Sequence, residues 1–169
     1  MKLHIGGEQK KEGWHILNIQ PKEGVDYIGD INDLNQFDAN SIQEIYASHV
    51  IEHVSQGNVL KTFDGIRRVL CPGGKFSVSV PDMDILCHSF ISPVTSPAVK
   101  WHVMRMMFGG QVDAHDYHFV GWNQAFMFDF LQRAGFLTAS RVDSFGLFMD
   151  TSEFRPYGFP ISLNVIAVK

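Results

Sequence analysis

The chain has 169 residues, of which 45% are hydrophobic and 19% are charged, and its formal net charge is -4. These values predict one domain, residues 1–169, with a hydrophobic core, and the mild negative charge argues against nucleic acid or an anionic membrane as a partner. No run approaches the roughly 20 apolar residues that span a bilayer, and glycine comes too early for a signal peptide. The two cysteines, Cys71 and Cys87, have neither disulfide nor metal-binding spacing, so we expect a cytoplasmic protein without metal ligands.

Short apolar runs that end at glycine, proline or a polar residue predict four strands in the first 50 residues. They lie at 3–5, 14–19, 25–30 and 42–47, and the third has the weakest pattern. Residues 48–54 are expected to turn helical directly after the fourth strand.

Helices and strands alternate in the rest of the chain. Residues 59–70 carry apolar side chains at helical spacing and precede Pro72 and two glycines, so they predict a helix. A strand at 75–80, a helix at 124–134 and strands at 136–144 and 163–168 complete the pattern. Residues 83–120 contain two prolines and a glycine pair, which predict short helices and a lid-like excursion.

This alternation predicts an α/β fold with a doubly wound, mostly parallel sheet, whose ligand site lies beyond the C-terminal ends of the strands. Gly6 and Gly7 follow the first strand, where glycine lets a ligand approach the backbone, although the full G-x-G-x-x-G spacing is absent. Asn18 ends the second strand and Asp30 the third, where a carboxylate could accept a hydrogen bond from an adenine amino group. Structural turns are the alternative explanation for these residues.

Residues 48–53 (SHVIEH) contain H-x-x-E-H, a pattern found in one class of zinc proteases. On a helix, His49 and His53 would share one face and could bind Zn²⁺ beside Glu52. Such an enzyme needs a third ligand and a long flanking helix, and the sequence indicates neither. The zinc hydrolase therefore stays a third hypothesis. The other two are that these residues only begin a helix and that they line a pocket.

Two longer blocks resemble a known family. Residues 42–54 (IQEIYASHVIEHV) and 66–80 (IRRVLCPGGKFSVSV), followed by Pro81 and Asp82, resemble the class I S-adenosylmethionine-dependent methyltransferases, in particular the small proteins of the type 11 group. In that group a strand ends in a small-residue turn followed by Glu-His, and a later helix ends in R-V-L-x-P-G-G before a strand. The resemblance covers most of the chain and implies a Rossmann-like fold.

The sequence departs from the family pattern in two places. About six residues separate Gly7 from Trp14, too few for the helix that usually follows the glycine motif and fewer than the dozen or so of a parallel crossover. The first crossover must therefore be a shortened loop. Asn18 also stands where the family usually has an acidic residue for the ribose, and an amide binds hydroxyls without the charge assistance of a carboxylate.

The resemblance implies methyl transfer from S-adenosylmethionine to a small-molecule or sugar-type acceptor. It places Gly6 and Gly7 at the amino-acid part of the cofactor, Asn18 at the ribose, Asp30 and Ile31 at the adenine, Ser48 and His49 at the methyl end, and Asp82 at the acceptor. The candidate catalytic bases are His49, His53, His115 and His118, because imidazole titrates near neutral pH. Residues 83–120 would form the acceptor lid, since insertions beyond strand ends usually set specificity.

A protein of a different class is also open at this point. The shortened first crossover and Asn18 suit a non-catalytic binding or accessory protein that keeps the fold and has lost efficient cofactor binding. Micromolar binding of S-adenosylmethionine would favour the enzyme, and no binding at millimolar ligand would favour the accessory protein. A homodimer is compatible with either interpretation.

Overall fold

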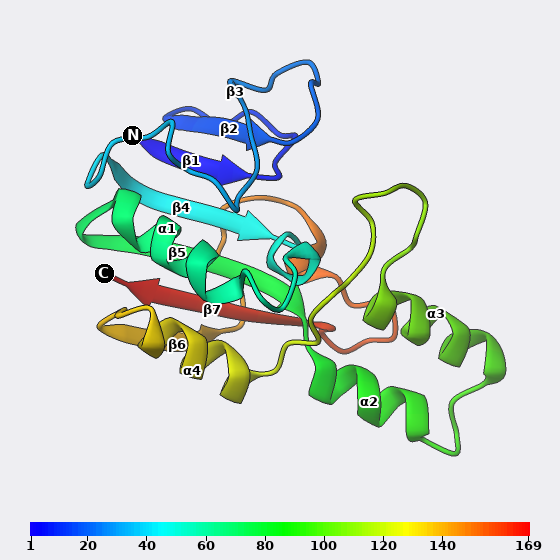
Figure 1. The fold of residues 1–169 in the computed structure, drawn as a ribbon. Helices are drawn as coiled ribbons and strands as arrows, with labels where there is room; N and C mark the ends of the chain where they lie inside the picture. Colours follow the sequence, from blue (N-terminus) through cyan, green and yellow to red (C-terminus); the bar gives the residue numbers. More distant parts are fainter.

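The computed structural model describes all 169 residues and contains one seven-stranded sheet (Figure 1). The strands are β1 (Lys2–Ile5), β2 (Trp14–Asn18), β3 (Tyr27–Ile28), β4 (Ile42–Ser48), β5 (Leu70–Pro81), β6 (Thr138–Val142) and β7 (Ser162–Val168). They lie in the order β3-β2-β1-β4-β5-β7-β6, so the sheet grows in two directions from β1. The first five strands are parallel, and β7 runs antiparallel to both β5 and β6. The predicted doubly wound, mostly parallel sheet is thereby confirmed.

The first three crossovers contain no helix. Residues 6–13 join β1 to β2 as a loop, which confirms the shortened first crossover, and the segments 19–26 and 29–41 are also irregular. The predicted helix at 48–54 is wrong beyond a single 3₁₀ turn, η1 (Ile51–His53), because the chain leaves β4 in an extended and left-handed conformation first. The first full helix of the chain is α1 (Val59–Val69).

The two faces of the sheet are covered differently. Side chains alternate across a strand, and β1, β4 and β5 turn the paired residues Leu3, Ile45 and Phe76 toward α1 and α4 (Gln124–Arg133), which lie together over one face in Figure 1. This side holds the main core, which includes Phe63 of α1. Apolar side chains at helical spacing are the reason that these two helices were predictable from the sequence.

The opposite face has no long helix. The next residues along the same strands, His4, Tyr46 and Ser77, lie on this side. The segment between β6 and β7, residues 143–161, crosses behind the sheet and packs Phe148 against His4 and Tyr46. It contains only one 3₁₀ turn, η2 (Thr151–Glu153). A loop therefore covers the face that crossover helices leave open.

Residues 83–120 form two short helices beyond the C-terminal end of β5. α2 (Met83–Ile91) and α3 (Pro97–Phe108) pack against each other, and the chain then returns along residues 109–121 toward η1 (Figure 1). Phe119 N–H donates to the carbonyl of Glu52 at 2.8 Å, which ties this return to η1. None of the helices combines the length and the apolar character needed to cross a membrane.

Candidate functional site

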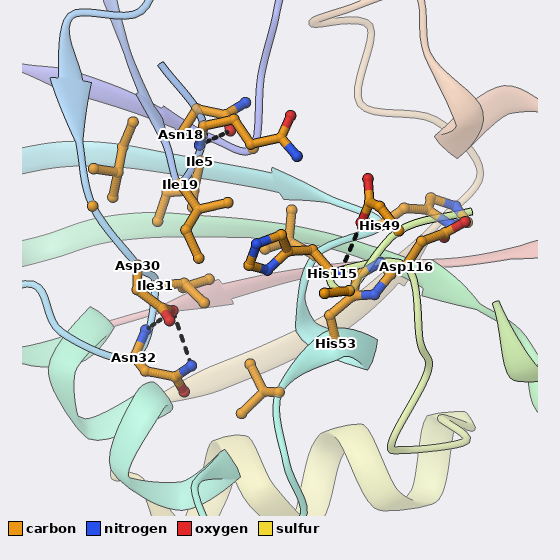
Figure 2. Close-up of a pocket in the computed structure, with 18 of the residues that line it drawn as sticks. Ile5, Asn18, Ile19, Asp30, Ile31, Asn32, His49, His53, His115 and Asp116 are labelled. Carbon is orange, nitrogen blue, oxygen red and sulfur yellow. Dashed lines mark hydrogen bonds between the residues drawn. The ribbon is translucent and has the colours of Figure 1, made fainter. Parts of the chain in front are cut away.

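A cavity of about 490 Å³ opens where the C-terminal ends of β1, β2 and β4 meet. Figure 2 shows Asn18, Asp30 and His49 around it, each from a different strand end or the turn that follows. The ends of parallel strands share one edge of the sheet, which is why residues this far apart in the sequence come together. The segment 112–116 and Phe119 close the cavity from the side of the predicted lid.

The two glycines after β1 have different surroundings. Gly6 lines the cavity with a φ of +74°, and a Cβ there would lie 2.5 Å from Cγ2 of Val50, so only glycine fits. Gly7 does not line the cavity. A Cβ on Gly7 would lie 2.4 Å from Nδ1 of His4, so this glycine makes room for a buried ring on the other face of the sheet.

Asn18 lines the cavity, but its side chain already has backbone partners. Its Nδ2 donates to the carbonyl of Gly7 at 3.3 Å, and its Oδ1 accepts from Gln20 N–H at 3.0 Å. Asn18 therefore holds the short β1–β2 loop to the end of β2. Glu8, which sequence reasoning missed, also lines the cavity and forms an ion pair with Lys22.

Asp30 and Ile31 lie together on the opposite wall. Asp30 Oδ1 accepts two hydrogen bonds from Asn32, from its backbone N–H and its Nδ2, both at 2.9 Å. Oδ2 of Asp30 has no such partner and is free to accept from a ligand. Ile31 is buried and supplies an apolar surface beside it.

His49 occupies the turn after β4. Its backbone is in the left-handed region, with a φ of +54°, a strained conformation for a residue with a Cβ. Its Nδ1 lies 3.2 Å from Oε1 of Glu52, and its Nε2 lies 3.0 Å from Oγ of Ser162. The preceding Ser48 does not line the cavity, and its Oγ is buried without a hydrogen-bond partner.

A second cavity of about 240 Å³ adjoins the first. Arg105, His102 and His118 give its lining a basic character, and Thr151 and Phe154 line it as well. His49 is the one residue that lines both cavities. The imidazole of His49 therefore stands at the junction between them.

Glu52 is a buried carboxylate, and nothing in the sequence indicated that it would be buried. It is 1% exposed, and His49, His53 and His118 surround it. Burial alone would raise the pKa of Glu52, but the contact with His49 and the charges of the three imidazoles hold it below its ordinary value. Burial lowers the pKa of His118, and the charge of Glu52 opposes part of that effect. The H-x-x-E-H pattern marked this stretch, but burial of its carboxylate has no signal in the sequence.

The remaining predicted residues lie in different places. His53 and His115 line the first cavity, and His115 is exposed on the segment that closes it. Asp82 lines neither cavity. Its carboxylate accepts from Arg141 at 2.8 Å and from the backbone N–H of Asp84, so it caps α2 and ties β5 to β6.

The zinc hydrolase hypothesis does not fit the geometry. η1 is three residues long, so no helix brings His49 and His53 onto one face. His49 contacts Glu52 and Ser162, whereas the ring of His53 stacks edge-on against His118 with centroids 4.8 Å apart. The two histidines of the motif therefore point to different partners.

Comparison with known proteins agrees with the fold. Residues 9–78 match the family model described as "Methyltransferase domain". No curated protein matches the sequence. Among solved structures, the chain resembles one in a complex between the Haloferax volcanii Trm112 methyltransferase activator and a methyltransferase, with a TM-score of 0.58 and 16% identity over 98% of this chain and 80% of that one.

Two further structures were solved with S-adenosylhomocysteine. The trans-methyltransferase CalH has a TM-score of 0.59 and 18% identity, and 98% of this chain covers 50% of its length. The Burkholderia thailandensis 1,6-didemethyltoxoflavin-N1-methyltransferase, which also holds 1,6-didemethyltoxoflavin, has a TM-score of 0.61 and 12% identity over 99% of this chain and 69% of that one. At these identities the likeness establishes the fold.

The chain has the fold of the class I methyltransferases, as the sequence resemblance predicted, and its residues 9–78 match the methyltransferase family model. Its strand order and its one antiparallel strand, β7, which lies between β5 and the edge strand β6, fit a Rossmann-like methyltransferase sheet. The chain reaches this fold without helices in its first three crossovers.

Proposed function

We propose that the protein is an S-adenosylmethionine-dependent methyltransferase that acts on a small-molecule or sugar-type acceptor. One observation carries the proposal: the turns after β1, β2, β3 and β4 converge on a single open cavity of about 490 Å³. Ligand cavities of about 300–1,000 Å³ bind molecules of cofactor size. The family match and the S-adenosylhomocysteine held by two proteins of the same fold support this cofactor.

The cofactor would lie across the strand ends. Its amino-acid part would approach the backbone at Gly6, where the absence of a Cβ leaves room, and its adenine would lie against Ile31. The adenine amino group would donate to the free Oδ2 of Asp30, while Oδ1 stays bonded to Asn32. The sulfonium methyl would then point toward His49 and the second cavity.

The ribose needs a different partner from the one predicted. Asn18 is committed to Gly7 and Gln20, so its role is to shape the short loop that replaces a helix. We assign the charged contact with the ribose hydroxyls to Glu8, which lies on this loop and lines the cavity. Glu8 would exchange its ion pair with Lys22, an exposed pair of low energetic value, for these hydroxyls.

The chemistry is a direct displacement in which the protein mainly positions two reactants in line. The acceptor would occupy the second cavity, whose Arg105, His102 and His118 suit an acceptor with anionic or hydroxyl oxygens. His49 lines both cavities, and we propose that its imidazole takes the proton that the acceptor loses as the methyl arrives, which requires Nε2 to exchange its contact with Oγ of Ser162 for the acceptor. Glu52 would act as the positioning residue that holds the other ring nitrogen.

Calorimetric titration with S-adenosylmethionine and S-adenosylhomocysteine tests the proposal. Wild-type protein should bind both at micromolar concentration. Asp30→Ala should bind at least about tenfold more weakly, since a hydrogen bond to a charged group contributes about 1.5–3 kcal/mol. Asp33→Ala is the matched control, because Asp33 accepts a similar turn hydrogen bond from Asn35 but does not line the cavity.

The competing protein class predicts a different result. A non-catalytic accessory protein would show no binding at millimolar cofactor, and equal affinities of Asp30→Ala and wild type would remove the adenine assignment. The open cavity counts against the accessory protein, since a lost site would be expected to fill with the protein's own side chains. The homodimer and the cytoplasmic location stay predictions, as does the lid role of residues 83–120.

A further inference from the structure

Three side chains with metal-binding atoms converge in the wall between the two cavities. They are Glu52 and His53 of η1 and His118 of the returning segment, and one donor atom from each lies within 4.8 Å of the other two. His53 lines the first cavity and His118 lines the second. The cluster therefore stands where the cofactor and acceptor regions meet, and the roles proposed above for Glu52 and His118 do not draw on its capacity to bind a metal.

The carboxylate of Glu52 is the first sign of a missing cation. Glu52 is 1% exposed, and neither of its oxygens accepts a well-aligned hydrogen bond. Nδ1 of His49 lies 3.2 Å from Oε1 of Glu52 but is poorly oriented for such a bond. A buried carboxylate without partners costs several kcal/mol, so it is retained where a positive charge binds beside it.

A hydrogen bond determines which nitrogen His53 can present to a metal. Nδ1 of His53 lies 3.1 Å from the carbonyl of Tyr117, and a carbonyl can only accept, so Nδ1 carries a hydrogen and Nε2 is the nitrogen available to a metal. Ligating histidines usually have such an outer partner, because it orients the ring and sets its tautomer.

The three groups of the cluster can all act as metal ligands. One nitrogen of each imidazole and one carboxylate oxygen of Glu52 lie within 4.8 Å of one another. In the unprotonated form that a metal requires, these atoms would present lone pairs to one small space, and a cation between them would hold them together.

Hydrogen bonds to backbone carbonyls hold the two ligand-bearing segments together. Phe119 N–H donates to the carbonyl of Glu52 at 2.8 Å, and Nε2 of Gln56 donates to the carbonyl of Phe119 at 3.1 Å. Gly109, with a φ of +85°, lets the returning segment pass so close that a Cβ would lie 2.2 Å from the carbonyl oxygen of Asp116. The two segments that supply the ligands are thus joined directly rather than through a flexible loop.

We propose that Glu52, His53 and His118 bind a divalent first-row transition metal ion, with Zn²⁺ as the representative ion. Two imidazoles and one carboxylate form a donor set typical of zinc and related metals, whereas Mg²⁺ and Ca²⁺ prefer oxygen ligands alone. Tetrahedral ligands about 2.1 Å from the metal lie about 3.4 Å apart, so small side-chain adjustments close the site. Three protein ligands leave the fourth position open, toward the cavities.

Metal titration of protein freed of any affinity tag tests the site. Calorimetry with ZnCl₂ should show one ion bound per chain, Co²⁺ should give the visible absorption of a tetrahedral complex, and MgCl₂ should show no binding at this site. Glu52→Gln, which keeps the side-chain shape, and His53→Ala should each weaken Zn²⁺ binding by at least about tenfold, the smallest loss expected even for outer partners of a metal site. His115→Ala is the control: His115 lies three residues from His118 and outside the cluster.

Two outcomes would overturn the inference: wild-type protein that binds no Zn²⁺ or Co²⁺, or Glu52→Gln and His53→Ala variants that bind as tightly as wild type. X-ray absorption of the Zn²⁺-loaded wild type gives an answer that needs no variant. Two imidazole ligands with oxygen neighbours are expected, and sulfur from Cys71 or Cys87 would contradict the assignment. These readouts measure metal binding alone, so their result is independent of whether the protein transfers methyl groups.

Discussion

We expect the buried imidazole of His4 to make the stability of this protein sensitive to acid. His4 lies on the loop-covered face of the sheet, with Phe148 stacked on it at 4.0 Å and Tyr46 beside it at 5.0 Å. Burial lowers the pKa of His4 to about 4, and the charge of Asp150 opposes that effect. In the unfolded chain the pKa of a histidine returns to about 6.5. Between these two values the unfolded chain binds a proton that the folded chain does not.

The free energy of unfolding should therefore be highest above about pH 6.5 and should fall as the pH drops toward 4. The loss from this one group is at most about 3 kcal/mol, at 1.36 kcal/mol for each pKa unit. Urea denaturation at a series of pH values between 7 and 4 measures it. His4→Leu should flatten the dependence, and His15→Leu, at an exposed histidine in the neighbouring strand, should not. Equal slopes for His4→Leu and wild type would show that another group causes the acid loss.

Single residues also show where sequence reasoning about the site stops. Gly6, Asn18, Asp30 and His49 were predictable because residues that follow parallel strands meet at one edge of the sheet. Asp82 met the same criterion and lies elsewhere, because its partner Arg141 is 59 residues away and nothing in the sequence pairs them.

At the scale of elements, the segment 143–161 replaces crossover helices as the cover of one sheet face. Phe148 anchors it: the ring is buried and lies 4.9 Å from Tyr46 and 5.3 Å from Trp14. The hydroxyl of Tyr46 also donates to Asp150 at 2.8 Å. These contacts tie the segment to β2 and β4.

Phe148→Ala should lower the free energy of unfolding by about 3–5 kcal/mol, the usual cost of truncating a buried aromatic side chain. The adjacent Met149 is 86% exposed, and Met149→Ala should change it by less than about 0.5 kcal/mol. Urea denaturation compares the two variants. A loss below about 1 kcal/mol for Phe148→Ala would mean that the segment only rests on the sheet and that the face is stable without it.

The sequence predicted the helix-covered half of the molecule better than the loop-covered half. Residues 59–69 and 124–133 repeat apolar side chains with the period of a helix and end at glycine or proline, so local pattern and tertiary packing agree. Phe145 and Phe148 do not belong to a repeating pattern of apolar residues. The segment 143–161 follows the surface of the sheet, and that surface is formed by other parts of the chain. The same reason hid the burial of Glu52, which depends on a segment more than 60 residues further on.

At the scale of the whole molecule, the cavity joins parts of the chain that are otherwise independent. Gly6 and Asp30 belong to the first third of the sequence, whereas the segment 112–116 comes after α3. That segment is exposed and is held mainly by its own bonds, such as Gln111 N–H to the carbonyl of Asp116 at 3.0 Å. A ligand in the cavity should therefore stabilise both parts together.

Hydrogen exchange with and without S-adenosylhomocysteine measures this coupling. At a ligand concentration of about 100 times Kd, binding stabilises the folded state by about 2.7 kcal/mol. Amide exchange that requires an opening in which the ligand cannot bind should then slow by up to about a hundredfold. We expect slower exchange at residues 29–32 and 112–116 together. α4 (Gln124–Arg133) lines neither cavity, so exchange of its amides should slow only where it occurs through global unfolding. Protection confined to residues 1–54 would mean that the segment 112–116 takes no part in cofactor binding and that the lid begins elsewhere.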